Sequence, residues 1–213
     1  MHGISLKRFQ HYWELIRNRQ GLSLTFNFYE DRSFRNASSV NETLIKESPE
    51  RDTAAACSEP SLRILYFVHT APKNVDKRQW LRSTIGDAEI AASVNSTIVF
   101  FVGVAPDPND QQAVEEEAER QRDIVVLNFT DSYRNLTHKF VQGMRWVSDN
   151  CLLSSTVTIV KMDDDILVNV FALSSYVSSL YMPETTIHCS VHIGVRPLRN
   201  RTSKWYVSKK EYG

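Results

Sequence analysis

Short apolar runs alternate with longer segments of mixed polar and apolar residues from residue 62 onward. The runs are rich in β-branched and aromatic residues, which predicts strands over 62–69, 97–103, 123–127, 156–162 and 187–195. The segments between them have helical periodicity and predict helices over 74–86, 110–121, 132–150 and 169–181. Strands and helices that alternate in this way predict an α/β fold with a mostly parallel sheet and helices on both faces.

The first 60 residues have a different composition. Residues 31–60 are rich in Ser, Asn, Glu and Arg and poor in aliphatic residues, so burial cannot offset the entropy that ordering would cost. We therefore predict an N-terminal segment and flexible stem over residues 1–60, with a short amphipathic helix within 4–29. Residues 61–213 are expected to form the globular domain.

Length and charge exclude several classes of protein. The chain has 213 residues, 42% of them hydrophobic, which is enough for one domain with a sizeable core. Its 25 Lys and Arg balance its 25 Asp and Glu, so it lacks the positive charge that most nucleic-acid binders need. No run of about 18 apolar residues is present, so no segment of this chain is predicted to span a membrane.

Cysteine and asparagine patterns bear on the cellular compartment. Three cysteines, Cys57, Cys151 and Cys189, are too few for a disulfide framework and match no zinc spacing. Cys151 and Cys189 could pair in an oxidising compartment. The His and Cys residues within 188–192 could be ligands of a soft metal, but this spacing alone is weak evidence. The pattern Asn-x-Ser/Thr exceeds the roughly two occurrences expected by chance, which favours the secretory pathway. It occurs at Asn36, Asn41, Asn95, Asn128, Asn135 and Asn200.

An acidic triplet, Asp163, Asp164 and Asp165, directly follows the strand predicted over 156–162. It therefore lies at the carboxyl end of a strand, where open α/β sheets bind their ligands. Three adjacent carboxylates repel one another unless a cation is near, and a divalent ion could also bridge the phosphates of a nucleotide. A solvated acidic turn is the alternative, but the apolar residues on both sides favour a metal site.

A basic pair forms the second candidate cluster. Arg78 and Arg82 are four residues apart on the helix predicted over 74–86, so their guanidinium groups share one face. Two guanidinium groups suit a diphosphate, because each can donate two parallel hydrogen bonds to phosphate oxygens. A solvated basic helix face is the commoner arrangement for such a pair. The charged run at 115–122 is predicted to be an exposed helix face.

Several stretches stand in the order that one enzyme family shows. They comprise Arg78, Arg82, Thr84 and Gly86, then 100–103, 115–125, 128–139, Trp146 with Cys151, 161–169 and 204–212. Together they resemble the inverting β1,3-galactosyltransferase family, which includes β1,3-N-acetylglucosaminyltransferases.

The resemblance implies a GT-A, Rossmann-like fold and a UDP-sugar donor. It implies a divalent ion, usually Mn²⁺, at Asp163 and Asp165, with Asp165 as the direct ligand. Asp163 would also face the ribose or sugar of the donor, and Asp164 belongs to the same donor site. Arg78 and Arg82 are then expected near the diphosphate or nucleotide.

The family also implies a location and partners. Its members are Golgi type II membrane proteins with a stem before a lumenal catalytic domain, which fits the stem predicted here. The expected partners are a UDP-sugar and a glycan acceptor on a glycoprotein or glycolipid, with no nucleic acid. A Golgi membrane anchor is expected for the full-length form.

Two features depart from the family pattern. Ile85 stands where the family usually has Trp, and Asn128 stands where it usually has Asp. The family's acceptor segment and its catalytic base are expected beyond Gly213, so residues 61–213 correspond to the donor-binding half of the domain. The chain therefore resembles a family member truncated at both ends, and we expect little turnover from it alone.

Three hypotheses follow from these features. The first is a hexosyltransferase that transfers galactose or a related hexose from a UDP-sugar in β1,3 linkage during protein glycosylation. The alternative is a non-catalytic paralogue that binds a UDP-sugar or a partner transferase. A metal-dependent phosphohydrolase is the third and has the least support, because nothing else in the chain supplies its expected partners.

Overall fold

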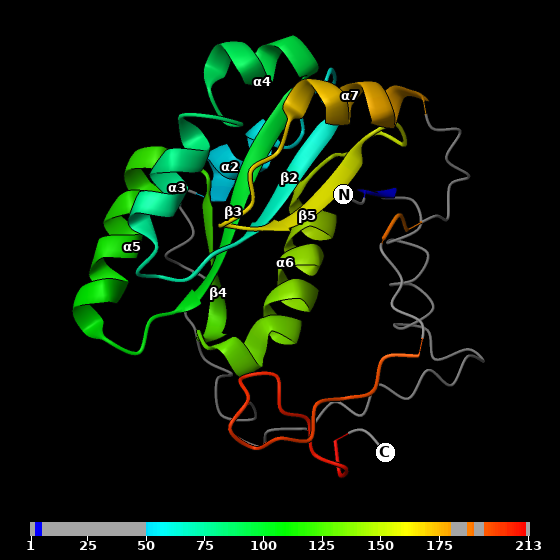
Figure 1. Ribbon diagram of the computed structural model, residues 1–213. Coiled ribbons are helices and arrows are strands. Elements are labelled where there is room, and N and C mark those ends of the chain that lie inside the picture. Colours follow the sequence, from blue (N-terminus) through cyan, green and yellow to red (C-terminus); the bar gives the residue numbers. More distant parts are fainter. Residues whose placement is uncertain (1–2, 6–49, 180–186, 190–193, 212–213) are drawn as a thin grey trace.

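A twisted five-stranded sheet forms the centre of the molecule (Figure 1). The computed structural model describes residues 3–5, 50–179, 187–189 and 194–211. Four strands are parallel: β2 (Ile64–His69), β3 (Ser96–Val104), β4 (Ile124–Thr130) and β5 (Thr158–Asp163). A short strand, β1 (Gly3–Ser5), joins β5 in the antiparallel direction, and the strand order is β1-β5-β2-β3-β4. The predicted α/β fold with a mostly parallel sheet is confirmed.

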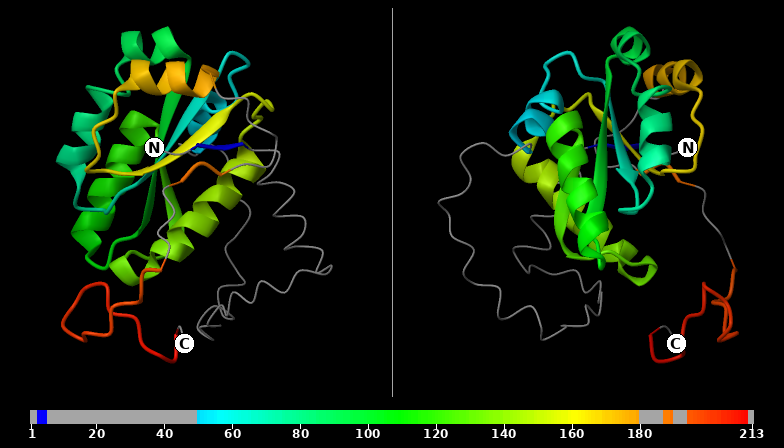
Figure 2. Two further views of the ribbon diagram at one scale, coloured as in Figure 1. Left: turned by 45° about the vertical axis from the view of Figure 1, so that its right-hand side comes forward. Right: turned by 90° about the vertical axis from the view of Figure 1, so that its left-hand side faces the viewer.

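Helices cover both faces of this sheet, as the two views of Figure 2 show. One face carries α3 (Val75–Arg82), α4 (Ala88–Val94), α5 (Pro108–Gln121) and α7 (Val170–Ser179), which contribute to one apolar cluster. The other face carries α2 (Glu50–Ala56) and α6 (Leu136–Asn150), which a 3₁₀ turn, η3 (Tyr133–Asn135), precedes. No described helix is long and apolar enough to cross a bilayer.

The apolar run of β2 divides between these two clusters because successive side chains of a strand point to opposite faces. Tyr66 and Val68 pack under α3 and α5, whereas Leu65 and Phe67 pack under α6. All six residues of β2 are buried, as expected of a central parallel strand.

The register of the sheet aligns the carboxyl ends of β2 and β5, and the parallel strand β3 extends past them. His69, the last residue of β2, lies beside Phe101 of β3 and Asp163 of β5. The segments that follow β2, β4 and β5 therefore emerge at the same edge of the sheet, where the ligand sites of such folds lie.

Two predicted elements differ from the observed ones. The helix predicted over 74–86 ends at Arg82, and the sequence analysis missed α4, which begins after Asp87. The Asp87 carboxylate caps α4 by accepting hydrogen bonds from the amides of Glu89 and Ile90. The described part of 187–195 contains no extended strand, because an apolar run alone does not provide a pairing partner.

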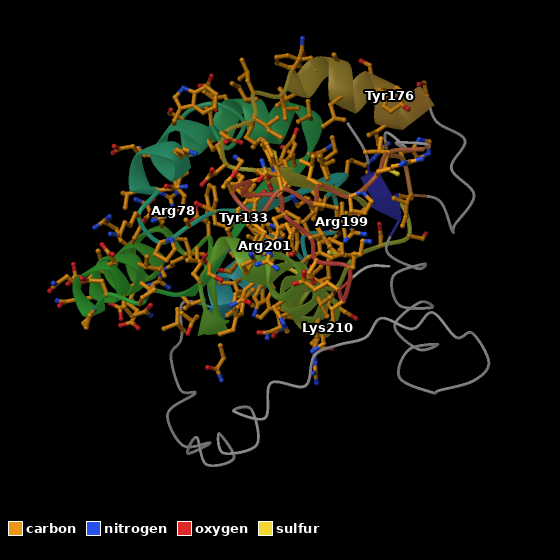
Figure 3. All side chains as sticks on the ribbon, turned by 60° about the horizontal axis from the view of Figure 1, so that its bottom comes forward. Arg78, Tyr133, Tyr176, Arg199, Arg201 and Lys210 are labelled. Atoms are coloured by element: carbon orange, nitrogen blue, oxygen red, sulfur yellow. A yellow bond between two sulfur atoms is a disulfide. The ribbon has the colours of Figure 1, made fainter. Side chains whose placement is uncertain are left out.

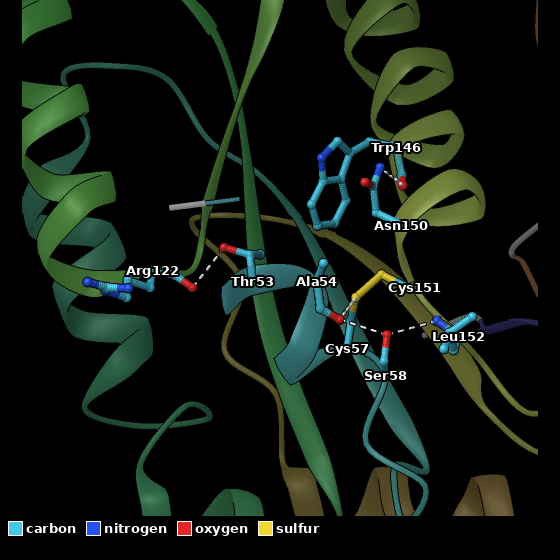
Figure 4. The surroundings of a disulfide bond; sticks show 9 residues. All are labelled: Thr53, Ala54, Cys57, Ser58, Arg122, Trp146, Asn150, Cys151 and Leu152. Carbon is cyan, nitrogen blue, oxygen red and sulfur yellow. Dashed lines mark hydrogen bonds between the residues drawn. A yellow bond between two sulfur atoms is a disulfide. The ribbon is translucent and has the colours of Figure 1, made fainter. Parts of the chain in front are cut away.

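The folded part of the chain begins ahead of the boundary predicted at residue 60. Helix α2 lies within the predicted stem, and Thr53 and Cys57 are fully buried. Thr53 donates a hydrogen bond to the carbonyl of Arg122, which ties α2 to the start of β4 (Figure 4). Residues 6–49, which make up most of the predicted N-terminal segment and stem and of the helix suggested within 4–29, lie outside the described residues.

The disulfide differs from the pair suggested by the sequence. Cys151 is bonded to Cys57 across 94 residues of chain (Figure 4), and Cys189 is free and exposed. The suggested Cys151–Cys189 pairing is therefore wrong. Cys57 follows α2 and Cys151 follows α6, and these two helices share one face of the sheet, a proximity that no sequence spacing reveals.

Candidate functional site

A pocket of about 260 Å³ opens at the carboxyl edge of the sheet. Its walls come from the segments after β2 (69–74), β4 (131–136) and β5 (163–165), and from Lys139 of α6. The predicted acidic triplet thus lines a pocket at the edge where ligands are expected.

Asp164 is the buried member of the triplet. It is 6% exposed and accepts hydrogen bonds from Thr70 Oγ1 at 2.7 Å, Asn74 Nδ2 at 2.6 Å and Lys77 Nζ at 3.0 Å. Burial acts to raise the pKa of Asp164, but these donors outweigh it and hold the pKa below its ordinary value. Asp164 therefore joins the β5 turn to the β2 turn rather than facing a ligand freely.

Asn74 illustrates how the site overrides local capping. It occupies the N-cap position of α3, where an Asn side chain usually accepts a hydrogen bond from the helix. Its side chain makes no such bond and instead donates its amide to Asp164. The start of α3 is thereby attached to the acidic turn.

Asp163 and Asp165 have a different environment, because their side chains are 55% and 67% exposed. A lysine lies near each of them: Lys161 Nζ is 2.5 Å from Asp163 Oδ1, and Lys77 Nζ is 3.8 Å from Asp165 Oδ2. Both carboxylates line the pocket on either side of the buried Asp164.

The exposed carboxylates of Asp163 and Asp165 fit a hard divalent cation whose other coordinating oxygens come from a bound ligand. Exposed carboxylate oxygens are the ligands that Mg²⁺ and Mn²⁺ prefer, and such ions commonly combine one or two carboxylates with substrate phosphates. In the described part of the chain, no group of three or more His, Cys, Asp or Glu side chains could hold an ion by itself. Asp163 and Asp165 would hold such an ion together with oxygens from a diphosphate and water.

Arg78 does not line the pocket. It is fully buried, and all five of its N–H donors are used within the protein. Its Nε and Nη2 donate to the carboxylate of Glu117 on α5, while Nη1 and Nη2 also donate to the carbonyls of Ala71 and Pro72. A diphosphate could reach this guanidinium only if one of these bonds were given up.

Arg82 lies one turn further along α3 and is also paired. Its Nη1 is 2.7 Å from Glu117 Oε1, and its Nε and Nη2 form two parallel bonds with the carboxylate of Asp123. The sequence analysis expected an exposed face at 115–122, but Glu117 is 2% exposed. That expectation is wrong for Glu117 because two arginines from α3 compensate its burial.

Arg78 is connected to the pocket through Thr70. Thr70 Oγ1 accepts a hydrogen bond from Arg78 Nη1 at 3.3 Å and donates one to Asp164 Oδ2 at 2.7 Å. Glu117, Arg78, Thr70 and Asp164 are therefore linked in one chain of polar contacts. Arg78 acts on the acidic turn through Thr70, as a positioning residue.

A second buried ion pair holds the opposite wall. Lys139 is 2% exposed, and its Nζ lies 2.7 Å from Asp131 Oδ2 and 2.6 Å from the carbonyl of Thr70. Asp131 also accepts a hydrogen bond from the amide of Gly103. A Cβ at Gly103 would lie 2.9 Å from the carbonyl of Phe129, so this close contact requires glycine. Lys139 thus joins the ends of β2 and β4 at the pocket.

The C-terminal segment contacts residues 133–134, which follow β4. Arg134 donates to the carbonyl of Tyr206, and Lys204 Nζ lies 5.9 Å from the centre of the Tyr133 ring. Figure 3 views the molecule from this side and labels Tyr133, Arg199 and Arg201. Segment 194–211 therefore lies next to the part of the pocket that the segment after β4 forms.

Comparison with known proteins shows the family of this chain. A family model described as Galactosyltransferase matches residues 76–213, about two thirds of the chain. This chain belongs to the galactosyltransferase family. The matched region includes the acidic triplet, both arginines, and the Lys139–Asp131 pair.

Individual family members show the same similarity. Beta-1,3-galactosyltransferase 1 of Mus musculus is 34% identical over 153 residues, covering 70% of this chain and 45% of that protein. Lactosylceramide 1,3-N-acetyl-beta-D-glucosaminyltransferase B of Xenopus laevis is 34% identical over 191 residues, covering 81% of this chain and 50% of that protein. The chain thus spans about half the length of the curated relatives that it matches.

Within this galactosyltransferase-family site, sequence reasoning found some residues and missed others. The structure brings Asp163, Asp164 and Asp165 together at the pocket and places Arg78 and Arg82 outside its lining. Sequence analysis missed the pocket roles of Thr70, Asn74, Lys77, Asp131 and Lys139. Their position after strands was the available signal, but which polar residue turns inward depends on partners far away in the chain.

Proposed function

We propose that this chain forms the donor-binding part of a hexosyltransferase that transfers galactose or a related hexose from a UDP-sugar to a glycan acceptor in β1,3 linkage. One observation carries the proposal. Two exposed carboxylates, those of Asp163 and Asp165, flank a buried Asp164 that accepts three side-chain hydrogen bonds. They line a pocket at the carboxyl edge of a parallel sheet, within the region that the family model matches. The relatives' names, a galactosyltransferase and an N-acetylglucosaminyltransferase, support this class of reaction.

The chain's own residues would bind and orient the donor. Asp163 and Asp165 would hold a divalent ion, Mn²⁺ in the first instance, while Asp164 fixes the turn that presents them. The ion would neutralise charge that develops on the diphosphate leaving group. Lys77, whose pKa is raised by its hydrogen bond to Asp164, remains a cation beside the same turn.

Isothermal titration calorimetry with UDP tests the donor site. We expect binding in Mn²⁺ to be at least tenfold tighter than in EDTA, a difference of about 1.4 kcal/mol. Asp165→Ala should remove this metal dependence. Asp149→Ala is the matched control, because Asp149 is a similarly exposed carboxylate on α6 that does not line the pocket.

The proposal would be contradicted if UDP bound equally well in EDTA and in Asp165→Ala. If UDP binding depends on Mn²⁺ and Asp165 as expected, competition between UDP-galactose and UDP-N-acetylglucosamine identifies the preferred sugar. A product assay with saturating donor and a lactose-type acceptor separates a transferase from a paralogue that binds a UDP-sugar without transfer. Release of phosphate from simple phosphoesters would favour a phosphohydrolase.

We also propose a lumenal location in the Golgi for the full-length form. The Cys57–Cys151 disulfide and the exposed sequon residues Asn95, Asn128 and Asn200 are consistent with an oxidising, glycosylating compartment. Imaging of a tagged full-length form against a Golgi marker in animal cells tests the location. A cytosolic signal would contradict it.

A further inference from the structure

Strand β4 forms an open edge of the sheet. It is the last strand in the order β1-β5-β2-β3-β4, so only one of its sides pairs with a described strand. Its first two residues, Ile124 and Val125, are 1% exposed, whereas Asn128 and Thr130 in its second half are exposed. Residues 125–128 also line a groove of about 340 Å³ together with residues of α6. The accessible part of this edge is therefore the second half of β4.

The composition of β4 makes such an edge prone to self-association. Its seven residues, 124–130, include no charged residue, no proline and no glycine. Exposed apolar strands of this composition pair readily with strands of other molecules. Asp123 and Asp131 stand on either side of β4, but their carboxylates form ion pairs with Arg82 and Lys139. The two flanking charges are therefore used inside the fold and do not guard the edge.

The two exposed polar residues of β4 belong to one glycosylation pattern, Asn128-Phe129-Thr130. Asn128 and Phe129 have no partner on β3, because the pairing register shifts between Gly103 and Val104 and leaves them in a bulge. Among the described residues, no hydrogen bond joins the side chain of Asn128 or the hydroxyl of Thr130 to another group. A group added at Asn128 would therefore break no hydrogen bond of the fold.

We propose that Asn128 carries an N-linked glycan that blocks strand pairing at the open edge of β4. This inference rests on the proposed lumenal location, because the oligosaccharide is transferred in the lumen of the secretory pathway. In that transfer, Nδ2 of Asn128 forms a bond to C1 of an N-acetylglucosamine, and the bond from C1 to the lipid diphosphate that carries the oligosaccharide breaks. The lipid diphosphate leaves, and the amide releases one proton to the transferring enzyme.

A glycan suits this edge for a steric reason. An added strand would have to lie about 4.8 Å from β4, and a bulky, hydrated oligosaccharide on a strand residue leaves no room for it there. Charged side chains serve the same purpose on other edge strands, but β4 has none. The opposite edge strand, β1, is only three residues long, which is itself a protection. Of the four described sequon asparagines, only Asn128 lies within a strand.

Glycopeptide mapping of the full-length form expressed in animal cells tests the modification. We expect a glycan on Asn128 in most molecules, and the sequons at Asn95, Asn135 and Asn200 serve as internal references. Glycans at these references and none at Asn128 would overturn the inference. The absence of a glycan from all four asparagines would instead overturn the proposed lumenal location.

Sedimentation velocity of the purified protein tests the effect on the edge. Asn128→Gln and Thr130→Ala both remove the acceptor pattern, whereas Thr130→Ser keeps it at the same place on the strand. We expect the first two variants to contain roughly threefold more self-associated protein than the wild type. Thr130→Ser should match the wild type. Asn200→Gln should match it too, because Asn200 is an exposed sequon residue that lies on no strand.

Asn128→Asp separates edge blocking from a general gain in solubility. It removes the glycan but places a charge on the edge, so we expect its self-association to lie between those of the wild type and Asn128→Gln. The melting temperatures of Asn128→Asp and Asn128→Gln should be equal, which would show that unfolding does not cause the difference. Equal self-association of Asn128→Gln and Asn200→Gln would overturn the edge-blocking role.

Discussion

Three adjacent aspartates with the same chemistry have two different roles in this structure. Asp164 is buried and accepts three side-chain hydrogen bonds, while Asp163 and Asp165 remain exposed at the pocket. The difference arises because the donors of Asp164 come from one short segment, 70–77, that folds over the end of β5. One residue of the triplet therefore serves stability, and its neighbours are left for a ligand.

Replacing Asp164 and Asp163 one at a time should separate these roles. Asp164→Asn places an amide among three donors, so we expect it to lower the free energy of unfolding by about 2–3 kcal/mol. Asp163→Asn should change stability by less than about 0.5 kcal/mol and yet weaken Mn²⁺-dependent UDP binding. Urea denaturation and calorimetry measure the two effects. Equal stability of both variants would show that the Asp164 contacts contribute little.

Glu117 is a second residue whose role depends on distant partners. Burial acts to raise its pKa, but hydrogen bonds from Arg78 and Arg82 outweigh burial and hold the pKa below its ordinary value of 4.5. A carboxyl with a depressed pKa stabilises the fold fully above its unfolded pKa. That stabilisation is lost as the pH falls through the folded pKa.

Glu117→Gln should therefore have a pH-dependent effect. At pH 7 we expect a loss of about 3–5 kcal/mol, because two buried guanidinium groups lose their shared anion. The gap between variant and wild type should begin to narrow below about pH 4.5, where the unfolded wild type takes up a proton, and should close as the pH falls through the lower folded pKa. Urea denaturation at several pH values measures this, with Glu119→Gln on the exposed face of α5 as control. An equal loss at pH 7 and at pH 3 would contradict the mechanism.

At the scale of elements, α6 connects the core to the pocket. Met144 and Val147 pack on the sheet, and Lys139 on the same helix reaches Thr70 and Asp131. Gly143 lies at the point of closest approach, where a Cβ would be 2.6 Å from Phe67 Cζ and 2.9 Å from Phe101 Cδ1. The helix can sit this close to the sheet only because residue 143 has no side chain.

Gly143→Ala should force α6 away from the sheet. We expect the overpacking cost of about 1–3 kcal/mol to exceed the roughly 1 kcal/mol that alanine adds to helix stability. The melting temperature should fall, and UDP binding should weaken because Lys139 shifts with the helix. A double variant with Phe67→Leu makes room for the methyl group and should recover part of both losses. A stabilised single variant would show that the two rings give way easily.

The sequence pattern predicted most of these elements and few of their contacts. The apolar runs of β2, β3, β4 and β5 were found because buried parallel strands need continuous apolar residues. Helix α4 was missed because a single capping aspartate sets its start. Arg78 looked like a ligand-binding residue because residue spacing shows the helix face it occupies and not what packs on that face.

At the scale of the molecule, one disulfide links two segments that lie far apart in the sequence. Cys57 and Cys151 connect the segment after α2 to the end of α6 across 94 residues, with Ser58 Oγ accepting from the amide of Leu152 beside them. A link over so long a loop restricts the unfolded chain strongly. It also anchors α2 against the domain.

Removing this link should destabilise the whole unit. For a loop of this length we expect the double variant Cys57→Ser, Cys151→Ser to lose up to about 4–5 kcal/mol of unfolding free energy. Cys189→Ser should leave stability unchanged, since Cys189 is exposed and free. Urea denaturation measures both, and mass spectrometry of unreduced peptides checks the pairing. A Cys151–Cys189 peptide would contradict the structure.

The sequence by itself determined the fold class and the place of the acidic triplet. Both depend on local order along the chain, because apolar periodicity defines strands and helices, and a strand's carboxyl end is known once the strand is. The tertiary structure alone decided which charges are buried. The pairing of Arg78 with Glu117, of Lys139 with Asp131 and of Cys57 with Cys151 depends on residues far apart in sequence, and only the packing of helices on the sheet brings them into contact.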